Sequence, residues 1–270
     1  MSYHLETAEH PENLRRVAID PVSRVEGHGK VTLLIDDANK VQQVRLHIVE
    51  FRGFEKFIQG RPYWEVPVMV QRLCGICPVS HHLAASKAMD IIVGAKHLTP
   101  TAEKVRRLMH YGQIMQSHAL HFFHLCSPDL LFGFDSEVGK RNIVGVAEKY
   151  PETARRGVLI RKFGQEAIRI TAGKRIHGTG AIPGGVNKSL SIEERDTLLK
   201  DVYQIIGWCR DAVHMARELH ETDPAMYNSF GIFRSHFMSL IGHGGEMDLY
   251  DGKLRARDEQ GAIFFDGVPQ

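Results

Sequence analysis

The sequence predicts an α+β fold, with a bundle of long helices, a small antiparallel β layer at the N-terminus and a β-hairpin at the C-terminus. Three observations support this prediction. Short alternating apolar segments occupy roughly the first 50 residues, helical spacing of apolar residues follows to about residue 220, and strand-like segments return near the end. A chain of 270 residues is also long enough to bury a substantial core.

The β layer is expected to follow a flexible lead-in over residues 1–15. Three short strands are predicted, at residues 17–20, 30–36 and 41–49. Apolar residues alternate at Val44, Leu46 and Ile48, which is typical of a half-buried strand.

The middle of the chain carries helix-start signals at regular intervals. The predicted helices span residues 83–95, about 100–125, a segment from 127, about 151–171 and about 191–220. Thr99 before Pro100 offers an N-cap followed by a proline at the first helical position, and Ser191 with Glu194 has capping-box spacing. Four or five long helices indicate a bundle.

The C-terminal segment returns to strand character. A turn signal at Asp251-Gly252 precedes a predicted hairpin over residues 253–265, with a second turn near Gln260-Gly261. The chain is therefore expected to divide into a β layer (16–60), a helical bundle (61–225) and a strand-rich tail (226–270).

Composition excludes several function classes. Because 34 basic residues balance 32 acidic ones, neither a nucleic-acid groove nor a contact with acidic membranes is indicated. Without a signal-like apolar core at the N-terminus or a membrane-span-length apolar run, we expect a cytoplasmic protein with no membrane span. Four cysteines are too few for a disulfide framework, and Cys126 and Cys209 are expected to be small buried residues.

The most informative motif joins Cys74, Cys77 and His81. Two thiolates separated by two residues can bind one soft transition metal together. A structural zinc site would need four ligands, and the sequence has no second cysteine pair. A thioredoxin-like redox pair would follow a strand, whereas this pair lies between two predicted helices. These observations favour a metal site and leave zinc as an alternative.

Two further blocks accompany the motif at residues 72–81: Asp-Pro-Val-Ser-Arg-Val-Glu-Gly-His-Gly at residues 20–29 and Phe-Arg-Gly-Phe-Glu at residues 51–55. In this order, the three blocks resemble the large subunit of nickel-iron hydrogenases, and most of all the soluble bidirectional, NAD-reducing type. The resemblance covers only the N-terminal part of the family's length. Residues 16–270 are therefore expected to form a partial large-subunit domain.

The resemblance implies specific roles at the cysteine motif. Cys74 would be a terminal nickel ligand and Cys77 a thiolate bridging nickel to iron, with carbon monoxide and cyanide on the iron. His81 would hydrogen-bond a bridging sulfur and so tune its charge. Arg72 would add positive field near the thiolates.

Two carboxylates also acquire roles from the resemblance. Glu26 would pass protons between the metal centre and solvent. Glu55 would help to hold a magnesium ion, since carboxylate oxygen suits a hard cation. From the residues alone, an ion pair between Glu55 and Lys56 remains an alternative.

The implied activity is reversible oxidation of H2 to protons and electrons. Electrons would pass to an iron-sulfur small subunit and on to NAD through flavin-binding diaphorase subunits, so iron-sulfur clusters, FMN and NAD would reside on partners. Family members carry a second Cys-x-x-Cys that this sequence lacks, so a truncated chain, inactive alone, is expected. The alternatives are a split subunit completed by another chain, an inactive complex I-like quinone-site or scaffold subunit, and a zinc-binding module.

A glycine-rich loop over residues 177–185 invites a nucleotide-binding interpretation. Its proline lacks an amide donor, no convincing strand precedes it, and no suitably placed acidic residue completes a Rossmann fingerprint. A similar Pro-Gly-Gly loop recurs in hydrogenase large subunits, and a structural role is expected here.

Overall fold

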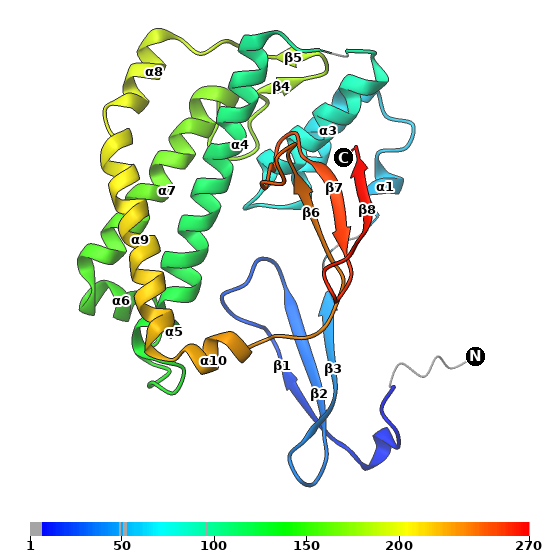
Figure 1. Cartoon of the computed structure of the whole chain (residues 1–270), viewed down its shortest axis with the longest axis vertical. Coiled ribbons are helices and arrows are strands. Elements are labelled where there is room, and N and C mark those ends of the chain that lie inside the picture. The colour runs from blue at the N-terminus through cyan, green and yellow to red at the C-terminus, as the bar shows by residue number, and fades with distance from the viewer. Residues whose placement is uncertain (1–6, 49, 51–52, 96, 270) are drawn as a thin grey trace.

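The computed structural model of the chain describes residues 7–48, 50, 53–95 and 97–269 (Figure 1). It has a helical bundle flanked by small antiparallel sheets from the two ends of the chain, so the predicted α+β fold class is confirmed. Part of the predicted lead-in, the last residue of the predicted third strand (Val49), and Phe51 and Arg52 of the second sequence block lie outside the described residues. The division into three segments stays a prediction.

The N-terminal sheet contains three antiparallel strands in sequential order: β1 (Arg15–Ile19), β2 (Gly29–Ile35) and β3 (Val41–Ile48). The register places Leu33 opposite Val44. The expectation that β3 is half-buried is wrong, because Val44 is 61% exposed and Leu46 is 65% exposed. Within the described part of the chain, no helix covers the sheet face that carries these side chains.

The bundle is built on α3 (Pro78–Ile92), α4 (Pro100–Leu120), α7 (Pro151–Ala172) and α9 (Val202–Thr222), with α4, α7 and α9 side by side (Figure 1). The described chain also contains shorter helical segments: α1 (Phe54–Phe57), α2 (Val66–Met69), α5 (Ser127–Phe132), α6 (Ile143–Lys149), α8 (Ile192–Leu199), α10 (Pro224–Ser229), and the 3-10 turns Pro11–Asn13, Tyr63–Glu65 and Val70–Leu73.

Several helix ends differ from the sequence-based expectation. α3 begins at Pro78 rather than residue 83, because proline fits the first helical position directly after Cys77. It ends at Ile92, and Gly94 follows with a left-handed φ of 74°. The helix expected over 191–220 is two helices, α8 and α9, separated at Lys200 and Asp201. Aspartate is a weak helix former, which favours a break there.

The capping predictions are confirmed. The Thr99 side chain accepts a hydrogen bond from the Ala102 amide, and Ser191 and Glu194 form a reciprocal capping box. The helix expected to reach residue 125 continues as a π-helical turn, η4 (His121–Cys126), before α5. The sequence pattern did not indicate this π turn.

Close helix contact organises the core. The backbones of α4 and α7 approach at Gly112 and Gly164, where a Cβ on Gly164 would lie 2.7 Å from the Gly112 carbonyl oxygen. One cluster of buried residues joins α3, α4, α7 and β4 (Ala181–Ile182): Val79, Leu83, Met109, Ile168, Ala172 and Ala181. This cluster lies under the helix that begins at the cysteine motif.

The glycine-rich loop forms a tight hairpin of β4 and β5 (Gly185–Val186). The fully buried Arg106 pairs with Asp90 at 2.6 Å and donates to the carbonyl oxygens of Ile182 and Gly185. A Cβ on Gly180 would lie 2.4 Å from the Thr171 carbonyl oxygen, a backbone atom, so close packing requires glycine there. These contacts are structural, as expected.

The C-terminal sheet has one strand more than the predicted hairpin. β7 (Lys253–Arg257) and β8 (Ile263–Val268) form that hairpin, and β6 (Phe237–Ile241) pairs with β7. Tyr250 joins this region to the bundle, since its ring lies 4.6 Å from the Lys87 ammonium and 4.5 Å from the Arg107 guanidinium. No described helix is both long and apolar enough to cross a bilayer.

Candidate metal centre

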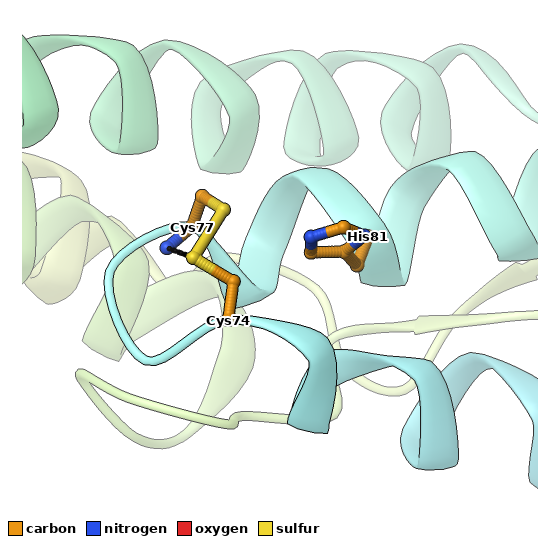
Figure 2. Close-up of side chains that lie close together, drawn as sticks. All are labelled: Cys74, Cys77 and His81. Atoms are coloured by element: carbon orange, nitrogen blue, oxygen red, sulfur yellow. Dashed lines mark hydrogen bonds between the residues drawn. A yellow bond between two sulfur atoms is a disulfide. The ribbon is translucent and has the colours of Figure 1, made fainter. Parts of the chain in front are cut away.

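The structure brings Cys74, Cys77 and His81 together at the start of α3 (Figure 2). Their two sulfur atoms and an imidazole nitrogen all lie within 4.8 Å of one another, and each residue is partly buried. Within the described part of the chain, no other group of three histidine, cysteine or acidic residues gathers so closely. The spacing read from the sequence thus corresponds to one shared site.

The donor set suits a soft transition metal. Thiolate sulfur and imidazole nitrogen are ligands that nickel, copper(I) and zinc accept. The cysteines are joined here as a disulfide, with Cα atoms 5.5 Å apart, so binding requires their reduction. Three donors fit one side of a four-coordinate metal, and the remaining ligands must come from other residues.

Helix α3 supports the site electrostatically. Cys77 occupies its N-cap, and the amides of Ser80 and His81 donate to the Cys77 carbonyl at 3.1 and 3.5 Å. Cys77 thus lies at the positive end of the helix dipole, a position that favours the thiolate form of a cysteine. Partial burial lowers the pKa of His81, which favours the neutral ring that can bind a metal or accept a hydrogen bond.

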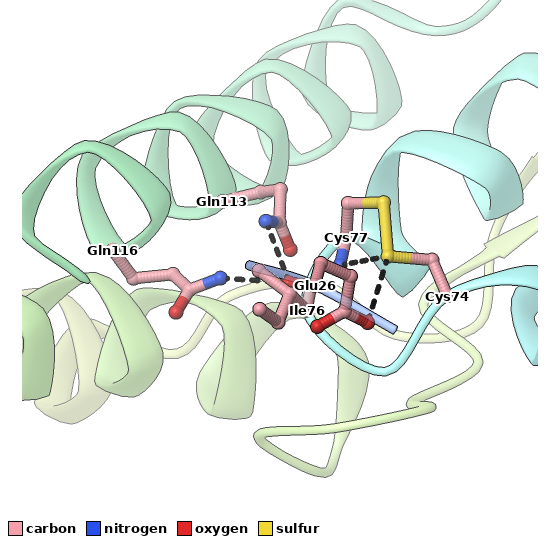
Figure 3. The surroundings of a disulfide bond; sticks show 6 residues. All are labelled: Glu26, Cys74, Ile76, Cys77, Gln113 and Gln116. Carbon is pink, nitrogen blue, oxygen red and sulfur yellow. Dashed lines mark hydrogen bonds between the residues drawn. A yellow bond between two sulfur atoms is a disulfide. The ribbon is translucent and has the colours of Figure 1, made fainter. Parts of the chain in front are cut away.

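Glu26 reaches the same site from the loop between β1 and β2. Its Oε1 atom lies 3.8 Å from Cys74 Sγ (Figure 3). Arg24 anchors this loop by donating to the Leu125 carbonyl and to Asp129 at 2.8 and 2.9 Å. On the other side of Glu26, the carboxylate of Glu50 accepts from the His28 amide at 2.9 Å.

Two further predicted site residues, Arg72 and Glu55, are not members of this cluster of possible ligands. Arg72 is exposed, and Glu55 is exposed in the first turn of α1. Lys56 donates to Gln59 at 2.9 Å. Among the described residues, Glu55 belongs to no group of three His, Cys, Asp or Glu side chains that lie within ligand distance of one another.

The expectation that Cys126 and Cys209 are buried is only partly correct. Both side chains are of intermediate exposure, and burial raises the pKa of each thiol. Cys209 packs beside the cluster around Phe123 and Ile205, while Cys126 Sγ lies 3.4 Å from His121 Nε2. Neither cysteine reaches the Cys74–Cys77 site as a third sulfur.

The sequence analysis did not predict three buried polar residues that support the cysteine loop and the start of α3: His82, Gln113 and Gln116. His82 is 1% exposed; its Nδ1 lies 2.8 Å from the Pro67 carbonyl oxygen, and its Nε2 accepts from the Ala181 amide at 3.0 Å. Gln113 and Gln116 of α4 contact the cysteine loop through Ile76. The sequence did contain a signal for the two glutamines, because the helical spacing from Met109 places Gln113 and Gln116 on the same buried face of α4.

Comparisons with known proteins identify the relatives of this chain. The family model described as nickel-dependent hydrogenase matches residues 52–132, and a HoxL-like model matches residues 16–51. The beta subunit of the NAD-reducing hydrogenase HoxS of Cupriavidus necator is 46% identical over 256 residues, covering 91% of this chain and 52% of that subunit. The chain thus spans about half the length of the curated relatives it matches.

Solved structures give the same result. A crystal structure of an NAD+-reducing nickel-iron hydrogenase in the H2-reduced state is 58% identical with a TM-score of 0.91, covering 94% of this chain and 56% of that one. A nickel-iron-selenium hydrogenase from Dm. baculatum shares the fold at 22% identity, with a TM-score of 0.76 over 94% of this chain and 55% of that one.

The family model, the curated relative and the solved structure together show a nickel-dependent hydrogenase large-subunit domain, and the chain belongs to that family. Within the family, its similarity to the NAD-reducing type is confirmed by the C. necator subunit and by the NAD+-reducing structure. The comparisons give no support to a quinone-site scaffold or a zinc-binding module.

Proposed function

We propose that this chain forms the N-terminal part of a hydrogenase large subunit that catalyses reversible oxidation of H2. One observation carries the proposal: the Cys74, Cys77 and His81 ligand atoms lie within 4.8 Å of one another. When bound, a nickel-iron centre supplies the heterolytic cleavage of H2 and accepts its electrons. Cys74 and Cys77 would hold this centre, which needs further ligands from other residues.

The neighbouring side chains would handle protons and charge. Glu26, with Oε1 3.8 Å from Cys74 Sγ, would take a proton at that oxygen and pass it towards solvent. His81 would donate a hydrogen bond to the bridging sulfur and so limit its negative charge. Arg72 would add positive field near the sulfurs, and because the residue is exposed, solvent and salt would weaken that field.

Partners and remaining cofactors complete the proposal. Electrons would leave to an iron-sulfur small subunit and reach NAD through flavin-binding subunits, in a cytoplasmic assembly. Carbon monoxide and cyanide would complete the iron coordination. Glu55 would supply one oxygen ligand to a magnesium ion.

The metal assignment is tested on the intact assembly purified with this chain. About one nickel and one iron per chain are expected, and replacing both cysteines (C74S/C77S) should remove nearly all the nickel. Cys209→Ser, a cysteine substitution away from the site, should leave the metal content unchanged. Full nickel loading of the C74S/C77S variant, or a wild-type assembly without nickel, would contradict the proposal.

The proton role is tested by Glu26→Gln in the same assembly. An amide cannot carry the proton, so exchange between H2 and deuterated water should fall by about 100-fold or more while nickel and iron are retained. Glu193→Gln, an exposed glutamate of α8, is the matched control and should exchange normally. Undiminished exchange in the metal-loaded Glu26→Gln assembly would exclude the proton relay.

A further inference from the structure

Two buried glutamines of α4 bind a single backbone carbonyl in the cysteine loop. Gln113 Nε2 donates to the Ile76 oxygen at 3.0 Å, and Gln116 Nε2 donates to the same oxygen at 2.9 Å (Figure 3). The two side chains are 3% and 5% exposed. A carbonyl oxygen has two lone pairs, so these donors use its full accepting capacity.

The same peptide unit presents its N–H to a sulfur. The Ile76 carbonyl carbon is bonded to the Cys77 nitrogen, and that N–H donates to Cys74 Sγ at 3.1 Å. A peptide unit is planar, so fixing the direction of the carbonyl also fixes the direction of the N–H. The glutamines therefore control where the Cys77 amide points, although neither touches a cysteine sulfur by hydrogen bonding (Figure 3).

The electrostatic effect of the two glutamines on this peptide unit also favours metal binding. Donors at the carbonyl oxygen polarise the peptide unit and make its N–H a stronger donor. A stronger N–H bond to sulfur favours negative charge on that sulfur, the form that binds a metal. One donor would suffice to satisfy a buried carbonyl, whereas two donors restrict its rotation as well.

We propose that Gln113 and Gln116 are positioning residues that hold the peptide between Ile76 and Cys77, so that its amide faces Cys74 and the two sulfurs are preorganised for a soft metal. This inference rests on the metal-binding part of the proposed function. It assigns to α4 a direct influence on the cysteine loop, through the helix face that also packs against α7.

The orientation of the amide is tested without any metal. In the reduced full chain labelled with 15N only at cysteine, each of the four cysteines gives one amide signal. In the Q113L/Q116L variant, the Cys77 amide should exchange with solvent about tenfold faster or more, while the Cys126 and Cys209 signals stay unchanged. The single variant Gln116→Leu keeps one donor to the Ile76 oxygen, so the Cys77 amide should exchange less rapidly than in the double variant. This single variant still tests the inference if the double variant does not fold.

Metal preorganisation is tested on the same proteins by anaerobic titration with Co(II). The sulfur-to-cobalt charge-transfer band should shift in Q113L/Q116L, and the Co(II) affinity should fall by about tenfold or more. Thr171→Val on α7 is the matched control. It removes a buried hydroxyl that bonds only within its own helix, so it should alter stability but neither the band nor the affinity.

The outcomes separate this inference from the proposed function. An unchanged Cys77 amide, or an altered amide with unchanged Co(II) affinity and band, overturns the positioning role. An altered amide together with weaker Co(II) binding supports it. If the wild-type chain binds no Co(II), the metal-binding premise fails and preorganisation is overturned with it, even where the amide result shows that the glutamines hold the loop.

Discussion

At the scale of single residues, His82 shows how burial selects one protonation state. The ring is enclosed between α2, α3 and β4, with Nδ1 near the Pro67 oxygen and Nε2 accepting from the Ala181 amide. A neutral ring with its proton on Nδ1 donates to the Pro67 oxygen and accepts from the Ala181 amide, a tautomer assigned from these two contacts; the Gln71 amide nitrogen also lies 3.1 Å from Nδ1. Burial lowers the pKa of His82 below its usual 6.5.

This burial predicts that the fold loses stability in acid. A histidine with a lowered pKa contributes its full stability above about pH 6.5, because the unfolded chain binds the proton more readily below that value. The free energy of unfolding should therefore fall between pH 7 and pH 5. His82→Leu should cost about 1–3 kcal/mol at pH 7 through unpaired backbone groups, and should make the pH dependence shallower.

Urea unfolding at pH 7 and pH 5 measures both effects. His118→Gln, at an exposed position on α4, is the control and should change stability by less than about 0.5 kcal/mol. An equally steep pH dependence in His82→Leu would show that other groups cause the acid sensitivity, for which the partly buried His110 and His124 are candidates.

The sequence allowed the cluster of Cys74, Cys77 and His81 to be predicted because its spacing is local. Residues separated by three or four positions at a helix start must lie close together. The contacts of Gln113 and Arg24 could not be predicted in the same way. They join segments distant in sequence, and the identity of their partners depends on how α4 and α5 pack.

At the scale of elements, contact between α4 and α7 depends on glycine. A Cβ at Gly164 would lie 2.7 Å from the Gly112 oxygen and 2.8 Å from the Gln116 nitrogen, both backbone atoms that cannot move alone. Gly164→Ala should separate the helices and lower the free energy of unfolding by about 1–3 kcal/mol, as overpacking does. Because Gln116 lies at this contact, the substitution also disturbs the support of the cysteine loop.

The control is another helical glycine. Gly207 in α9 has open space where a Cβ would be, so Gly207→Ala should stabilise the chain by up to about 1 kcal/mol through helix propensity. Thermal and urea unfolding of the two variants should therefore shift in opposite directions. A neutral or stabilising Gly164→Ala would mean that the two helices lie further apart than described.

Element boundaries were predictable where they depend on local capping. Thr99 and Ser191 each satisfy amides within their own first turn, so sequence spacing was sufficient. The strand at Phe237–Ile241 was missed because its short apolar run lacks alternation and becomes a strand by pairing with β7. The π turn at His121–Cys126 likewise has no spacing signal.

At the scale of the whole molecule, the alternation of residues in one strand does not predict which face of the sheet is buried. The alternation in β3 correctly predicted a strand, yet the apolar face of that strand is open in the described chain. Leu34 of β2, which points to the opposite face, is 4% exposed. Which face packs against other elements depends on non-local structure, and so the half-buried prediction for Val44 and Leu46 was wrong.

The open face predicts how the purified chain behaves. Val44 and Leu46 should bind a hydrophobic dye and favour self-association, since exposed apolar area gains free energy on burial. The variant V44T/L46T keeps strand propensity, so dye fluorescence and the associated fraction in sedimentation should fall while stability changes little. Leu34→Thr makes the same kind of substitution on the buried face and should instead lower the unfolding free energy by about 2 kcal/mol or more. If V44T/L46T were as destabilising as Leu34→Thr, the β3 face would be covered in solution.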